Sequence, residues 1–232
     1  MKLLGIIGGL GPESTLEYYR LLFEAYRSRV HDGSAPLIVV NSIEMKKLVD
    51  WVSAEAYAEM VDYLVAEIER LARAGADFAI ISANTPHIVF DQIRERSPIP
   101  LISIIEATAR AAKRQKLARP ALFGTRFTMQ GSFYPKVFER EGISLVVPDS
   151  TEQNYIHDKY MNELVKGDIR ESTRDGLLRI VDRMIERDSI DALILGGTEL
   201  PLIIQDLGDR QIPLLDTTRI HVNAAIDEML SS

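Results

Sequence analysis

The 232-residue chain contains no cysteine. Without thiols it has no disulfide bond, no thiolate metal ligand and no cysteine nucleophile. Its four histidines are too scattered for a metal spacing such as H-E-x-x-H, so we expect no metal site. No apolar run reaches the roughly 18–20 residues that span a bilayer. The first residues form a strand and a glycine turn rather than a signal peptide, so we expect a cytoplasmic protein without a membrane partner.

Positively charged residues are fewer than negatively charged ones. The chain has 27 Lys and Arg against 34 Asp and Glu, which gives a formal net charge of -7. The basic residues form no stripe and no nucleic-acid-binding motif occurs, so no nucleic-acid partner is expected. With 46% hydrophobic residues the composition is that of a globular protein. The length suits one large domain or two lobes of about 100 residues each.

Short apolar runs rich in β-branched residues alternate with longer amphipathic stretches. Strands are expected at residues 3–7, 37–41, 78–82, 100–104, 120–124, 143–147, 191–196 and 212–216. Helices are expected at residues 15–30, 54–74, 106–116, 133–141, 154–188 (with an interruption near 167–168) and 220–230. Strands that alternate with helices of this length are typical of βαβ units, in which a parallel sheet is buried on both faces.

Two strand ends resemble each other, "FAIISANTPH" at residues 78–87 and "ALILGGTELP" at residues 192–201. They lie about half the chain apart, which predicts two similar α/β lobes. We assign residues 1–99 and 209–232 to the first lobe and residues 100–208 to the second. Ligands of open parallel sheets bind beyond the carboxyl ends of the strands. The polar corners at these ends are therefore expected to meet at one ligand cleft between the lobes.

The first corner, "GGLGPEST" at residues 8–15, follows the first strand. Glycines such as Gly9 allow the backbone to approach a ligand, and the helix that starts near Ser14 directs its positive end toward an anion. The stretch has neither the Gly-Lys-Ser/Thr of a Walker A loop nor the G-x-G-x-x-G spacing of a dinucleotide site. The alternative is a glycine turn that serves packing alone.

The second corner comprises Ala83, Asn84, Thr85, Pro86 and His87. The side chains of Asn84 and Thr85 can donate hydrogen bonds to a carboxylate or to an enolate-like oxygen. Alternatively they cap the next helix, with Pro86 in its first turn. A lone histidine such as His87 is more often structural than catalytic.

The third corner carries Gly197, Thr198 and Glu199. Thr198 mirrors Thr85. Glu199 can orient a neighbour, cap a helix or act as a base.

Further strand ends supply hydroxyl groups and cations. Thr125 and Thr128 lie after the strand at 120–124, and Asp216 and Thr217 are expected to cap the last helix. The cations that would pair with a carboxylate ligand are expected among Lys46, Lys47 and Lys166, although most surface lysines are simply solvated.

Taken together, the motifs resemble those of the aspartate/glutamate racemase family, the cofactor-independent amino-acid racemases. The resemblance runs essentially end to end and rests on the order and spacing of "IGGLGPEST", "ANTPH", "FGTRFTM", "GGTELPLI" and "DTTRIH". It implies two pseudo-symmetric α/β lobes with the ligand site between them, and a homodimer. It also implies inversion of an α-carbon without pyridoxal phosphate or any other cofactor, by one cysteine on each face of the substrate.

The chain departs from the family at the two cysteines. Ala83 stands where the family has Cys-Asn-Thr, and Gly197 stands where it has Gly-Cys-Thr-Glu. Glu199 and His87, with Glu44 as a further option, are the candidate substitutes for the thiols. The resemblance and the corners together give these candidate ligand-binding residues: Gly9, Lys47, Asn84, Thr85, Thr125, Thr128, Lys166 and Thr198.

Three functions remain open at this point. The first is an isomerase of a small amino acid or related carboxylate that uses substitute acid and base groups. The second is a related carbon-acid decarboxylase or lyase, which needs an enolate-stabilising pocket but not two thiols. The third is a non-catalytic protein that binds a carboxylate.

Overall fold

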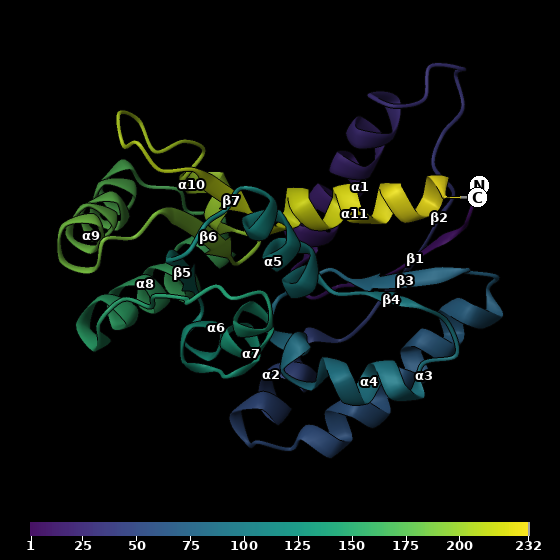
Figure 1. The fold of residues 1–232 in the computed structure, drawn as a ribbon. Coiled ribbons are helices and arrows are strands. Elements are labelled where there is room, and N and C mark those ends of the chain that lie inside the picture. Colours follow the sequence, from purple (N-terminus) through teal and green to yellow (C-terminus); the bar gives the residue numbers. More distant parts are fainter. Residues whose placement is uncertain (232) are drawn as a thin grey trace. The chain divides into compact units, whose positions relative to one another are not determined.

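The computed structural model describes residues 1–231. They form a mixed α/β fold with two compact units, each built on one parallel sheet (Figure 1). The first unit contains residues 1–104 and the C-terminal residues from Thr218, and the second contains Ile105–Thr217. The expected α/β class is confirmed. The chain returns to the first unit at Thr218 rather than at residue 209, because the strand at Leu214–Asp216 pairs with the strand at Ala192–Gly196.

The first unit holds a four-stranded sheet of order β2-β1-β3-β4, with all neighbouring strands parallel. Its strands are β1 (Leu4–Gly8), β2 (Ile38–Ser42), β3 (Phe78–Ile81) and β4 (Leu101–Ile102). Its helices are α1 (Pro12–Arg27), α2 (Met45–Ser53), α3 (Tyr57–Arg73), the 3₁₀ turn η1 (Thr85–Val89), α4 (Phe90–Arg96) and α11 (Thr217–Leu230).

Alternation along β1 and β3 divides the first unit's core between two faces of the sheet. Leu4 and Ile6 pack with apolar residues of α1 and α11 on one face. Ile7 and Ile81 pack with α2, α3 and α4 on the other. Every residue of β1 is buried. A parallel strand covered by helices on both faces reads as a continuous apolar run, which is why the sequence predicts it well.

The second unit holds a three-stranded parallel sheet of order β5-β6-β7. Its strands are β5 (Pro120–Gly124), β6 (Ala192–Gly196) and β7 (Leu214–Asp216). Its helices are α5 (Ile104–Arg114), α6 (Arg126–Gln130), α7 (Phe133–Arg140), α8 (Ser150–Asn162), the 3₁₀ turn η2 (Leu164–Lys166), α9 (Glu171–Asp188) and α10 (Leu200–Ile203).

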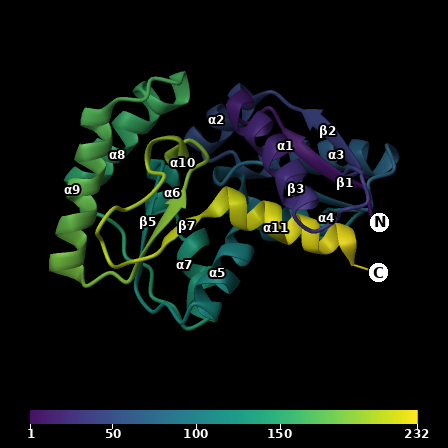
Figure 2. The ribbon, with the colours of Figure 1, turned by 90° about the horizontal axis from the view of Figure 1, so that it is seen from above.

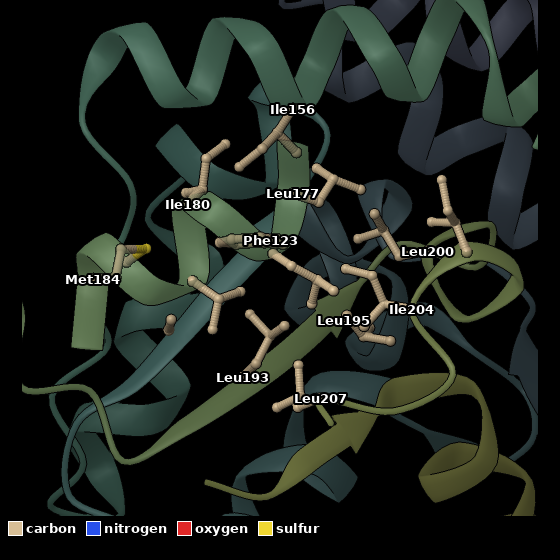
Figure 3. Packing of buried hydrophobic residues seen from close by; sticks show 14 of the residues in the cluster. Phe123, Ile156, Leu177, Ile180, Met184, Leu193, Leu195, Leu200, Ile204 and Leu207 are labelled. Carbon is tan, nitrogen blue, oxygen red and sulfur yellow. The ribbon is translucent and has the colours of Figure 1, made fainter. Parts of the chain in front are cut away.

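Helices α8 and α9 lie side by side in both views of the ribbon (Figure 2). They form the helical region expected at 154–188, and its interruption near 167–168 is confirmed, because Gly167 adopts a left-handed conformation after η2. Ile156 of α8 and Leu177 of α9 pack with Phe123, Leu193 and Leu195 of the sheet in one apolar cluster (Figure 3).

The strand expected at residues 143–147 is reduced to one bridge, between Ala121 and Val146. The segment follows β5, since the Ser144 amide donates to the Ala118 carbonyl at 3.0 Å and the Leu122 amide to the Val146 carbonyl at 2.9 Å. Pro120 has no N–H with which to extend this ladder. The prediction of a full strand there was wrong for that reason.

Candidate functional site

The loop after β1 is shaped by its glycines. Gly9 has φ +77° and Gly11 φ +110°, conformations that residues with a side chain rarely adopt. A Cβ on Gly9 would lie 2.4 Å from the carbonyl oxygen and 2.7 Å from the amide nitrogen of Ile43. The Gly9 amide donates to Thr15 Oγ1 at 2.9 Å. Glycine is therefore required here by the close approach of the chain that follows β2, which favours the packing explanation of this corner.

The loop after β1 and the end of β3 meet in the first unit. The Ser14 hydroxyl donates to the Ser82 carbonyl at 2.9 Å, and the Ser82 hydroxyl donates to the Ile7 carbonyl at 2.9 Å. These bonds link the first corner to the segment that carries Ala83 and Asn84. Two of the predicted ligand-binding corners thus lie together at the carboxyl end of one sheet, as expected for a parallel sheet.

Asn84 is 5% exposed and precedes η1. Its side chain makes no capping hydrogen bond to that turn, so capping does not explain its presence. Ala83 and Thr85 are half-buried beside it. Asn84 thus places a buried amide just beyond the carboxyl end of β3.

His87 is held in one neutral tautomer. The Ile104 amide donates to His87 Nε2 at 3.3 Å, so Nδ1 carries the proton and donates to the Ala83 carbonyl at 3.0 Å. The ring also stacks on Phe90, with 4.8 Å between the ring centres. Burial lowers the pKa of His87 to about 3. Both nitrogens are occupied and the ring stays uncharged, an arrangement that favours the structural role over the acid/base role.

His221 of the "DTTRIH" motif is also buried and neutral. Tyr18 donates its hydroxyl proton to Nδ1 at 2.8 Å, and Nε2 donates to the Ile102 carbonyl at 2.9 Å. Burial lowers the pKa of His221 to about 4. Thr217 of the same motif donates its hydroxyl to the Leu195 carbonyl of the neighbouring strand β6 at 2.7 Å.

In the second unit, β5 and β6 end side by side at Gly124 and Gly196. A Cβ on Gly124 would lie 2.8 Å from the Gly196 carbonyl and 2.9 Å from the Cβ of Thr128. Thr128 is fully buried under this contact. Thr125 caps α6, since its hydroxyl oxygen accepts from the Thr128 amide at 3.3 Å. The Thr125 and Thr128 hydroxyl oxygens also lie 3.2 Å apart, so both hydroxyls have a local structural partner.

The corner after β6 forms a buried polar cluster. Thr198 donates its hydroxyl to Glu199 Oε2 at 2.8 Å, and the Tyr160 hydroxyl donates to the same carboxylate oxygen. Glu199 is 7% exposed. Burial is the main cause that raises the pKa of Tyr160 well above its usual value, and the neighbouring Glu199 carboxylate is the second. The phenol therefore keeps its proton. A carboxylate that accepts from two hydroxyls can orient a ligand or accept a proton.

Tyr160 was not among the residues predicted from the sequence. The residue lies near the end of α8, 39 positions before Glu199, within an ordinary helical pattern. The glycine at position 197 was the available signal, because a glycine at a strand end often marks the close approach of another group.

The three predicted lysines are exposed. Lys47 is on α2 with its Nζ 5.2 Å from the centre of the Tyr63 ring. Lys166 is exposed in η2. Lys46 pairs with Asp50 at 2.6 Å. Glu44 caps α2 by accepting from the Lys46 amide at 3.2 Å.

Within residues 1–231, no helix is long and apolar enough to cross a membrane. Over the same residues, no group of three or more His, Asp or Glu side chains is arranged to hold a metal ion.

Comparisons with known proteins identify the family. The Asp/Glu/Hydantoin racemase model matches residues 7–225. The broad specificity amino-acid racemase RacX of Bacillus subtilis (strain 168) is 21% identical over 99% of each chain. The structure of an aspartate racemase homologue from Pyrococcus horikoshii OT3 superposes with a TM-score of 0.88 and is 33% identical in sequence. The structure of a Yersinia pestis protein provisionally assigned as an Asp/Glu racemase superposes with a TM-score of 0.92 and is 31% identical. Both matches cover 100% of each chain. The chain therefore belongs to the Asp/Glu/Hydantoin racemase family.

Proposed function

We propose that the protein is an isomerase that acts on a small amino acid or dicarboxylate without pyridoxal phosphate and without thiols. The observation that carries this proposal is the pair of matching strand-end corners, Ala83-Asn84-Thr85 in the first unit and Gly197-Thr198-Glu199 in the second. Each keeps its polar residues. The relative named as an amino-acid racemase supports the same class of ligand.

Proton transfer sets the main constraint on this proposal. Removing an α-proton needs a base on one side of the carbon, and inversion needs a donor on the other. In the two-thiol mechanism implied by the family resemblance, cysteines fill both roles, and this chain has none. A threonine hydroxyl is too weak a base without activation. Of the two substitutes predicted from sequence, Glu199 is favoured, because both ring nitrogens of His87 are engaged in hydrogen bonds.

The test is solvent deuterium exchange at the α-carbon, followed by NMR, with a panel of amino acids and dicarboxylates. Exchange accompanied by inversion is the expected result. Glu199→Gln should reduce the rate about 10²-fold or more, the range typical of general acid–base catalysis. Ligand binding without any exchange would overturn the isomerase assignment and favour a carboxylate-binding protein.

Two other functions are supported by particular observations. The absence of both thiols favours a non-catalytic protein that binds a carboxylate. A decarboxylase or lyase would need only stabilisation of an enolate, which buried hydrogen-bond donors supply. Release of CO₂ from substituted malonates would identify the decarboxylase. Cytoplasmic location and a homodimer are further proposals from the sequence, and light scattering in solution tests the dimer.

A further inference from the structure

The space beside Gly197 is occupied by Tyr160. A Cβ built on Gly197 would lie 2.5 Å from Cε2, 2.8 Å from Oη and 2.9 Å from Cζ of that ring. Contacts under 3.0 Å essentially never occur for real Cβ atoms. The φ of Gly197 lies outside the left-handed region, so backbone conformation does not demand glycine. Glycine is present because the tyrosine ring fills the side-chain space.

The same tyrosine binds the carboxylate of the corner. The ring of Tyr160 belongs to the apolar cluster of the second unit, which fixes its position. Its hydroxyl donates to Glu199 Oε2, the oxygen that also accepts from Thr198 at 2.8 Å. A carboxylate at 7% exposure is stable only with such partners. The two hydroxyls hold this oxygen in one place, next to position 197.

We infer that Tyr160 is a positioning residue that fills the side-chain space of position 197 and fixes Glu199 there as the proton-accepting group of this corner. A hydroxyl–carboxylate pair thus stands where the family resemblance implies a thiol. This inference rests on the proposed isomerase function.

Removal of the α-proton balances with Glu199 as the acceptor. The carboxylate of Glu199 takes the α-proton and becomes a carboxylic acid. The electron pair of the broken C–H bond stays on the α-carbon and delocalises into the substrate carboxylate. Return of a proton from Glu199 to the same face restores the starting configuration, so Glu199 accounts for exchange at the α-carbon, and inversion needs a proton donor on the opposite face. Tyr160 and Thr198 keep their own protons and hold the acceptor in place.

Because the chain has no cysteine, a cysteine introduced at position 197 is its only thiol. The reaction rate of that thiol then tests whether Tyr160 fills the space beside this position. Gly197→Cys should react slowly with a small aromatic disulfide, and Gly197→Cys with Tyr160→Ala about tenfold faster, since thiol reactivity follows access. Gly142→Cys is the control, because nothing lies within 4 Å of a Cβ at that position of the same unit. Its rate should be unaffected by Tyr160→Ala. Equal rates for the two Gly197→Cys proteins would overturn the inference.

A spectroscopic test covers the case in which Tyr160→Ala does not fold. The carboxyl ¹³C resonance of Glu199, assigned with Glu199→Gln, should shift in Tyr160→Phe, which keeps the ring but removes the hydroxyl. Tyr155→Phe is the same change on the same helix and should leave the resonance in place. An unchanged resonance in Tyr160→Phe would contradict the positioning role.

Deuterium exchange separates this inference from the proposed function. Exchange by the unaltered protein that falls at least tenfold in Tyr160→Phe, but not in Tyr155→Phe, supports both. Exchange that neither Tyr160→Phe nor Glu199→Gln reduces overturns the inference and leaves the function intact. Absence of exchange in the unaltered protein overturns the function and with it the proton-accepting role, while the thiol and NMR results still decide whether Tyr160 positions Glu199.

Discussion

Two glycines with almost the same φ angle, Gly9 and Gly142, differ in the space around them. Their φ angles are +77° and +75°. A Cβ at position 9 would meet the Ile43 backbone at 2.4 Å, whereas nothing lies within 4 Å of one at position 142. The sequence identified the glycine turn at residues 8–11 but not its neighbour, because Ile43 approaches only after the β1–β2 pairing has formed. The sequence therefore shows that a glycine is present, but it does not show which neighbouring atoms require one.

Alanine at the two positions should therefore have unequal effects on stability. Gly142→Ala should lower the free energy of unfolding by about 1–2 kcal/mol, the strain of a left-handed alanine. Gly9→Ala should lose about 1–3 kcal/mol more, because the backbone of Ile43 must also move. Urea unfolding of both variants measures the difference, and equal losses would refute the packing explanation of this loop.

At the scale of elements, the α8 helix begins with a capping box. The Glu152 amide donates to Asp149 Oδ1 at 2.9 Å, and the Asp149 amide donates to Glu152 Oε2 at 3.1 Å. Hydrogen bonding from the Glu152 amide lowers the pKa of Asp149. The helix positions Tyr160 at its other end, so its start matters for the candidate site.

Asp149→Ala should lower the melting temperature by about 2–4 °C, the shift expected for loss of one cap in a chain of this size. Asp149→Asn keeps an oxygen that can accept from the Glu152 amide and should melt close to the unaltered protein. It also removes the exposed ion pair with Arg187, which contributes little. Thermal unfolding followed by circular dichroism tests this, and similar losses in both variants would assign the effect to charge instead of capping.

Elements differ in how well the sequence predicts them. The buried strands and long helices follow from continuous apolar runs and helical spacing, and β1, β3, β5, β6 and α3 appear where expected. The short helices α2, α4, α6 and α10 were missed, because four to nine residues carry too little periodicity. Whether residues 143–147 form a full strand depends on Pro120, a residue of β5 that is distant in the sequence. The contact between Tyr160 and Glu199 also arises only on folding, so the sequence does not predict it. The corners are predictable because each directly follows an apolar strand.

At the scale of the whole molecule, the two units differ in their buried titratable groups. His87 and His221 both belong to the first unit, along with the single tryptophan, Trp51. Both histidines are fully buried and uncharged, with pKa values of about 3 and about 4. In the unfolded chain a histidine has a pKa of about 6.5. Acidification therefore protonates the unfolded state first.

The free energy of unfolding of the first unit should consequently fall as the pH is lowered from about 6.5 toward 4. The slope should approach about 2.7 kcal/mol per pH unit, about 1.4 for each histidine. Urea unfolding followed by Trp51 fluorescence, from about pH 7.5 to about pH 5, reports on this unit and lies above the range in which most carboxylates titrate. His221→Gln retains a donor and an acceptor for Ile102 and Tyr18 but cannot titrate, so it should remove about half of the slope. A variant that keeps the full slope would show that His221 does not remain neutral in the folded unit.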